Sequence, residues 1–157
     1  MTDDERALLK ELEYLRDHVA QLSSSDGYLY CNMHDFVLQQ GRWFSPQPLP
    51  AGVTPRLPTF CYANASALHR RTKGALRYVE GFALSARGTV HQHAWCADYE
   101  DQVVDPTWCS PATSGAGLAY LGLPFRLMLN GRRRRRLPII DDWQHGFPIL
   151  KHQPQQE

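Results

Sequence analysis

The sequence predicts an α+β fold in which helices come first and an antiparallel sheet follows. The N-terminal part of the chain carries apolar residues at helical spacing, whereas large apolar residues alternate with smaller or polar ones after Leu76. The 157 residues are 43% hydrophobic, which is enough to build one core. We therefore expect a single domain over residues 1–157.

An amphipathic helix is predicted within residues 1–25. Thr2 and Glu5 have the spacing of a capping box. The helix then carries one narrow apolar seam, formed by Leu8, Leu12, Leu15, Val19 and Leu22. Such a seam usually packs on its own domain. The alternative is a weak homodimer contact between two copies of the helix.

A second short helix is expected within residues 28–44, and a proline-rich loop follows over residues 45–58. This loop either lines a substrate groove or serves as a packed connector. Cys61 then begins an alanine-rich run without proline or glycine, and Gly74 is placed to stop it. We expect a helix over about residues 61–73, with Cys61 near the positive end of its dipole, which favours the thiolate.

Three strands are predicted after this helix, and the last two form a hairpin. Pairing His93 with Asp105 centres the turn at Tyr99 and places Trp95 opposite Val103, so all four paired side chains lie on one face. The Asp105 carboxylate can then orient the His93 imidazole. The predicted strands cover residues 75–85, 91–98 and 102–108, whereas residues 118–129 fit a helix or a strand equally well.

Residues 55–125 resemble the transglutaminase-like branch of the papain-like cysteine enzymes. The order of Cys61, His93 and Asp105 matches that family. Three short segments match its strands in order: Tyr78-Val79-Glu80-Gly81-Phe82, His93-Ala94-Trp95 and Val104-Asp105-Pro106-Thr107. The family often has a glycine shortly before the cysteine, where this chain has Thr59-Phe60.

The resemblance implies a nucleophile-bearing helix packed on an antiparallel sheet, and a catalytic triad of Cys61, His93 and Asp105 without a cofactor. The expected activity is acyl transfer on a peptide, protein or small amide or ester substrate through a thioester. A chain of this length favours hydrolysis over transamidation, because little room remains for a second substrate domain. Trp95 and Glu80 are candidate substrate-binding residues, while Trp108 is expected in the core.

A zinc site is the chemical alternative, since His91, His93, Cys96 and Cys109 are all potential ligands. The strand period argues against it, because Cys96 points away from the two histidines and the ligand spacing is not that of known zinc motifs. We expect no metal. Four widely spaced cysteines in a chain of this size favour free thiols over disulfides.

Two non-catalytic functions also fit the sequence. The fold could serve as a protein-binding module with an inert Cys61. The run Arg132–Arg136 could instead contact phosphates of a nucleic acid, although the net charge is only +1. The acidic N-terminus lacks the pattern of a secretory signal, and no apolar segment is long enough to cross a membrane, so we expect a cytoplasmic protein. Residues 151–157 are expected to form a flexible tail.

Overall fold

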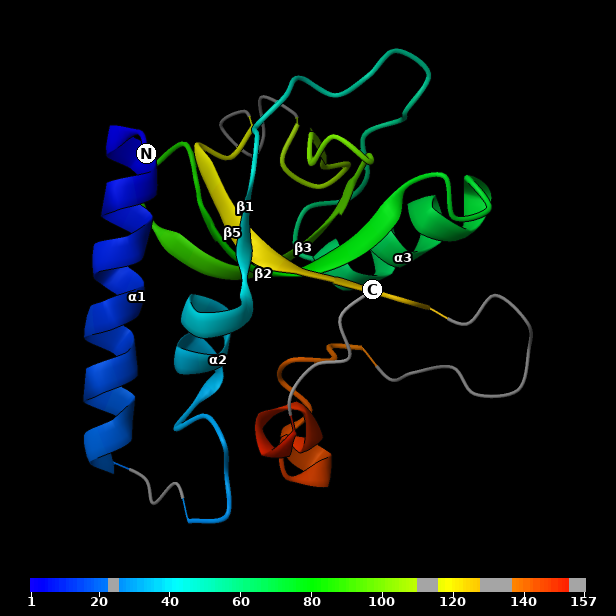
Figure 1. Ribbon diagram of the computed structural model, residues 1–157. Helices are drawn as coiled ribbons and strands as arrows, with labels where there is room; N and C mark the ends of the chain where they lie inside the picture. Colours follow the sequence, from blue (N-terminus) through cyan, green and yellow to red (C-terminus); the bar gives the residue numbers. More distant parts are fainter. Residues whose placement is uncertain (23–25, 110–115, 128–136, 153–157) are drawn as a thin grey trace.

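The computed structural model describes residues 1–22, 26–109, 116–127 and 137–152. Within them, three α-helices pack against a curled antiparallel sheet, which confirms the α+β class (Figure 1). The helices are α1 (Asp3–Leu22), α2 (Met33–Gln40) and α3 (Cys61–Arg71). The strands are β1 (Arg42–Phe44), β2 (Arg77–Leu84), β3 (Val90–Ala97), β4 (Val103–Val104) and β5 (Ala119–Phe125), in the order β1-β5-β2-β3-β4. None of the helices in these ranges is long and apolar enough to span a membrane.

Helix α1 begins with the predicted capping box. The Thr2 amide donates to Glu5 Oε2 at 2.7 Å, and the Glu5 amide donates to Thr2 Oγ1 at 3.1 Å. Leu8 and Leu12 are fully buried, whereas Leu22 is exposed. The first half of the seam therefore packs on its own domain, and a homodimer contact through α1 stays a prediction.

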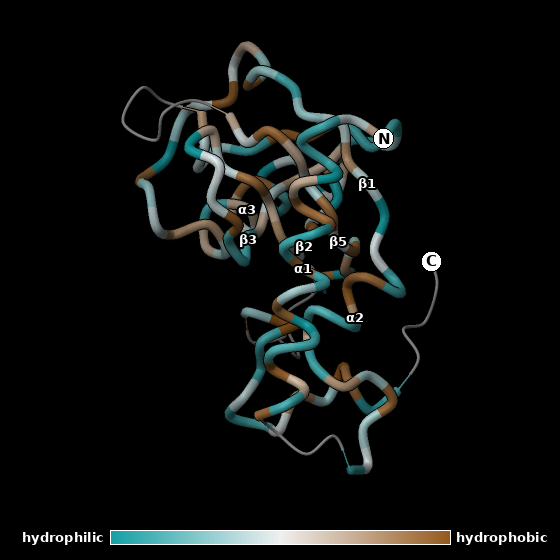
Figure 2. Tube along the Cα trace, turned by 90° about the vertical axis from the view of Figure 1, so that its left-hand side faces the viewer, coloured by the Kyte–Doolittle hydropathy of each residue, from teal (hydrophilic) through white to brown (hydrophobic). Residues whose placement is uncertain are grey.

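The sheet has two buried faces. The helix face carries Tyr78, Phe82, Ala94 and Cys96, which cluster with residues of α1, α2 and α3. The other face, here called the His93 face, carries Val79, Ala83, Trp95 and Tyr120, and strand alternation places His93 on it. In Figure 2, apolar stretches run through these central strands. Burial on both faces explains why successive residues of β2 and β5 are nearly all buried, whichever way their side chains point.

The β3–β4 hairpin differs from the predicted register. Cys96 pairs with Val104 and Ala97 with Val103, so the turn is centred at Glu100. Asp98 accounts for the shift, because its Oδ1 accepts from the amides of Glu100 and Gln102 and closes a tight turn there. A shift by two residues preserves the faces, so Asp105 still lies on the side of His93.

Strand β4 is shorter than expected, and the ambiguous segment is a strand. Only residues 103 and 104 pair with β3, because Pro106 cannot continue the ladder. Residues 119–125 form β5, which pairs with β2 along its whole length. Gly81 of β2 pairs with Gly122 of β5. A Cβ on Gly122 would lie 2.7 Å from the Trp95 ring. This close approach gives the Trp95 indole its space beside His93.

Candidate active site

His93 and Asp105 form a buried pair. His93 Nε2 lies 2.7 Å from Asp105 Oδ2, and the two side chains are only 2% and 4% exposed. Asp105 Oδ1 accepts from the amides of Thr107 at 2.8 Å and Trp108 at 3.2 Å. These two bonds fix the carboxylate in the turn that follows β4, so it can hold one orientation of the imidazole.

Tyr120 is a further partner of Asp105 that the sequence did not reveal. Its hydroxyl donates to Asp105 Oδ2 at 3.0 Å and accepts from the Gly117 amide at 3.0 Å. Tyr120 comes from β5, so its position depends on the strand that local spacing left ambiguous. The carboxylate therefore receives bonds from the His93 ring, two turn amides and a phenol.

Two indole rings enclose the His93 ring. Trp108 stacks on it with centroids 4.0 Å apart and an interplanar angle of 16°, and Trp95 is nearly parallel at 6.2 Å. Trp108, which was expected in the core, is half-buried and packs against the core cluster of the His93 face, where its ring covers the imidazole. The stacking keeps water away from the His93–Asp105 pair.

Cys61 is the first residue of α3, as predicted, and lies against His93. In the described residues, β4 pairs only with Cys96 and Ala97, so the part of β3 that carries His93 is a sheet edge. Helix α3 packs over β3, where Cys96 Sγ donates to the Ala65 carbonyl at 3.2 Å. The Cys61 side chain is close enough to His93 to contribute to the raised pKa of the imidazole. Because Asp105 occupies Nε2, the nitrogen left for the thiol is Nδ1.

The charges of this cluster favour an imidazolium. Burial by itself would lower the pKa of His93, but the charge and hydrogen bond of Asp105, with a smaller contribution from Cys61, raise it to about 9. Burial would raise the pKa of Asp105, but the charge and hydrogen bond of His93 and the turn amides lower it. The favoured form of His93 is therefore a cation that lies beside the Cys61 side chain.

The N-terminus of α3 has free donors beside Cys61. Phe60 occupies the N-cap position and provides no side-chain hydrogen bond to the first turn. The first amides of a helix lack partners within the helix and lie at the positive end of its dipole. The Cys61 amide can therefore donate to an oxyanion that forms on a carbonyl attacked by the Cys61 thiolate.

A strained residue lies two positions before Cys61. Thr59 has φ 76°, in the left-handed region that glycine adopts without cost. The strain fixes the direction in which the loop enters α3.

We expect Thr59→Gly to raise the free energy of unfolding by about 1 kcal/mol, because it relieves the left-handed strain of a β-branched residue. Urea denaturation monitored by tryptophan fluorescence measures it. Thr54→Gly, at an exposed position of the same loop without a positive φ, is the matched control and should be neutral or destabilising. Equal effects of the two changes would contradict the assignment of strain to Thr59.

Glu80 and Trp95, the tentative substrate-binding residues, are both buried. The Glu80 carboxylate accepts from the Ile139 and Ile140 amides at 2.7 and 2.9 Å and from the Tyr78 hydroxyl at 2.7 Å. It thus anchors the C-terminal segment to β2. Trp95 has no exposed surface and packs edge-to-face on Phe44 and Tyr120. Neither residue offers a surface to a substrate in this structure.

The sequence offers four upstream side chains as a second oxyanion donor, which are Tyr28, Tyr30, Gln39 and Gln40. Three of them contact other groups in the structure. Gln39 Nε2 donates to Asp35, the Tyr28 hydroxyl donates to the Gly146 carbonyl, and Tyr30 is buried against Phe36. In the described residues, the site therefore contains one clear backbone donor, the Cys61 amide.

The remaining sequence expectations concern metals, thiols and the basic run. The described residues contain no group of three or more His, Cys, Asp or Glu side chains placed to hold a metal ion. All four cysteines are free thiols. The run Arg132–Arg136 and tail residues 153–157 lie outside the described residues, while Lys151 ends the short helix η3 (Pro148–Lys151).

No family model, no curated protein and no solved structure matches this chain. The case for a function therefore rests on the geometry of the Cys61, His93 and Asp105 cluster.

The His93–Asp105 pair predicts a pH dependence of stability. The pKa of His93 is raised in the folded state, so protonation of His93 adds to the free energy of unfolding. This stabilisation is fully present below about pH 6.5 and is lost as the pH rises through about 9. We expect the free energy of unfolding to fall by about 2 kcal/mol across this range. Urea titrations at several pH values measure this slope. His93→Gln should lack it, and an unchanged slope in that variant would contradict the raised pKa.

Proposed function

We propose that this chain is a cysteine-dependent acyl-transfer enzyme that acts on an amide or ester bond, as a hydrolase. The main observation behind this proposal is the buried His93 ring, whose Nε2 lies 2.7 Å from Asp105 Oδ2, together with Cys61 beside the same ring at the start of α3. This arrangement has the roles of a nucleophile, a proton-transferring imidazole and an orienting carboxylate. The resemblance to transglutaminase-like enzymes supports the same function.

In the proposed reaction, the Cys61 thiolate attacks the substrate carbonyl and the Cys61 amide donates to the resulting oxyanion. The C–N or C–O bond then breaks, and the imidazolium of His93 gives its proton to the leaving amine or alcohol. A thioester on Cys61 remains. Water then adds to the thioester while His93 takes a proton from the water. The carboxylic acid leaves, and the Cys61 thiolate and the His93 imidazolium are restored.

The other three cysteines provide an internal comparison for a test. Burial raises the pKa of the Cys31 and Cys109 thiols, and raises that of Cys96 to about 12. Cys31 and Cys109 are nevertheless more exposed than Cys61, which is 8% exposed. Accessibility alone therefore predicts that Cys31 and Cys109 react first, whereas the proposed chemistry predicts Cys61.

The experiment is limited alkylation by iodoacetamide at pH 6, followed by peptide mapping. We expect label on Cys61 before the other three cysteines, and loss of the fast phase in Cys61→Ser. Label that appears first on Cys31 or Cys109 would contradict the proposal and favour the protein-binding alternative.

A further inference from the structure

The segment that leads into the nucleophile has a fixed backbone. The Arg56 amide donates to the Pro106 carbonyl at 2.7 Å, which ties the segment to the turn after Asp105. Asn64 Nδ2 donates both to the Leu57 carbonyl at 2.8 Å and to Thr107 Oγ1 at 3.1 Å. The segment is therefore held by α3 on one side and by the Asp105 turn on the other.

This fixed segment exposes two large apolar side chains. Leu57 is 71% exposed and Phe60 is 58% exposed, and Phe60 directly precedes Cys61. Single exposed apolar residues are common on protein surfaces. Leu57 and Phe60, however, lie on a segment whose backbone is already held in place. When a ligand covers them, this segment therefore loses little conformational entropy.

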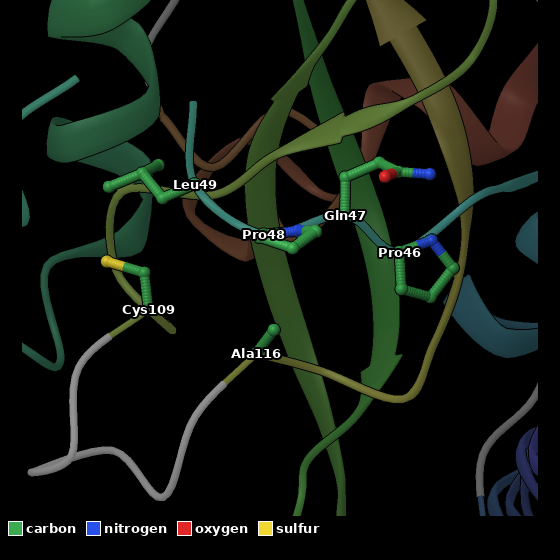
Figure 3. Close-up of a pocket in the computed structure, with 6 residues that line it drawn as sticks. All are labelled: Pro46, Gln47, Pro48, Leu49, Cys109 and Ala116. Atoms are coloured by element: carbon green, nitrogen blue, oxygen red, sulfur yellow. The ribbon is translucent and has the colours of Figure 1, made fainter. Parts of the chain in front are cut away.

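The same loop also forms a groove near the triad. The groove has a volume of about 370 Å³ and is lined by Pro46, Gln47, Pro48, Leu49, Cys109 and Ala116. Figure 3 shows Leu49 and Cys109 at the same end of it. Cys109 follows Trp108, which stacks on His93, and Leu49 packs against the core cluster that includes Cys61. This end of the groove thus lies next in the chain to the Trp108 ring that stacks on His93.

We propose that Leu57, Phe60 and the Leu49 end of the groove bind an apolar acyl group or side chain next to the carbonyl that Cys61 attacks. The inference rests on the proposed function and narrows its substrate class to amides or esters with an aliphatic or aromatic group beside the reacting carbonyl. Apolar lining with few polar groups is typical of a site that recognises such a group by burial.

The test compares two electrophiles that share one warhead, 2-chloroacetamide and N-benzyl-2-chloroacetamide. Each rate constant for Cys61 is divided by that of free cysteine, which removes intrinsic reactivity. We expect the normalised rate of the benzyl probe to exceed that of the small probe by roughly tenfold, as expected if about half of a phenyl ring is buried.

The variant Leu57→Ala/Phe60→Ala should bring this ratio close to one. Alanine is chosen at the N-cap position because a serine there would cap α3 and change the donors beside Cys61. Leu22→Ala, which removes an equally exposed leucine at the end of α1, is the control and should keep the full ratio.

The outcomes separate the two proposals. A normalised ratio near one in the wild-type chain, or a high ratio that survives in Leu57→Ala/Phe60→Ala, would overturn the apolar site and leave the proposed function intact. Reaction of Cys61 no faster than that of the other cysteines, with both probes, would remove the proposed function and the apolar site together.

Discussion

Replacing His93 by alanine is expected to slow the alkylation of Cys61 by about 100-fold at pH 6.5, because only about one in a hundred free thiols with a pKa of roughly 8.5 is ionised at this pH. The imidazolium favoured by Asp105 stabilises the thiolate, and its removal leaves Cys61 with the helix dipole alone. Stopped-flow measurements with iodoacetamide give the rate constants.

The control for this change is His69→Ala. His69 is also buried, and its Nδ1 lies 2.7 Å from the Leu76 carbonyl, at the other end of α3 from Cys61. Its loss removes a buried histidine without touching the reactive cluster. Comparable slowing in His69→Ala and His93→Ala would show that the effect comes from disturbance of α3, and would contradict a direct role of His93.

The largest expected loss of stability comes from Glu80→Ala. The change leaves the Ile139 and Ile140 amides and the Tyr78 hydroxyl without their buried acceptor. Each donor left without an acceptor costs about 1–3 kcal/mol. Part of this loss is offset, because the burial that raises the pKa of Glu80 makes its charge costly and the alanine variant no longer buries that charge. We expect the free energy of unfolding to fall by about 3 kcal/mol in urea denaturation.

Glu80→Gln is the matched variant, because an amide keeps one acceptor oxygen at nearly the same position. It should cost about 1 kcal/mol, since one oxygen can still accept from the C-terminal segment. Hydrogen exchange should show faster exchange at Ile139 and Ile140 in Glu80→Ala than in Glu80→Gln. Wild-type stability of Glu80→Ala would contradict an anchoring role.

Local sequence spacing predicts several elements of the fold correctly. The capping box at Thr2 and Glu5 and the helix that begins at Cys61 follow from local spacing, and both are as predicted. The hairpin faces are also correct, because a register shift by two residues leaves side-chain direction unchanged. Strand β5 was not predictable, since its apolar run fits both periodicities and its identity is fixed by pairing with β2.

The site was predictable where it depends on one hairpin and one helix end. His93 and Asp105 come together because they flank the same turn, and Cys61 was placed by its helix. Tyr120 and the stacking of Trp108 on His93 depend on contacts between distant segments, which no local spacing encodes. Glu80 was noticed as a charge in an apolar row, but its partners lie far along the chain.

The most direct test of the proposed function is detection of an acyl group on Cys61 during turnover of 4-nitrophenyl acetate. We expect a burst of nitrophenol equivalent to one site per chain, an acetyl group mapped to Cys61, and its decay as water resolves the thioester. Asp105→Asn should reduce the burst rate, because an amide no longer stabilises the imidazolium. Acetylation spread over the four cysteines, or absent from Cys61, would contradict the proposal that Cys61 is the nucleophile.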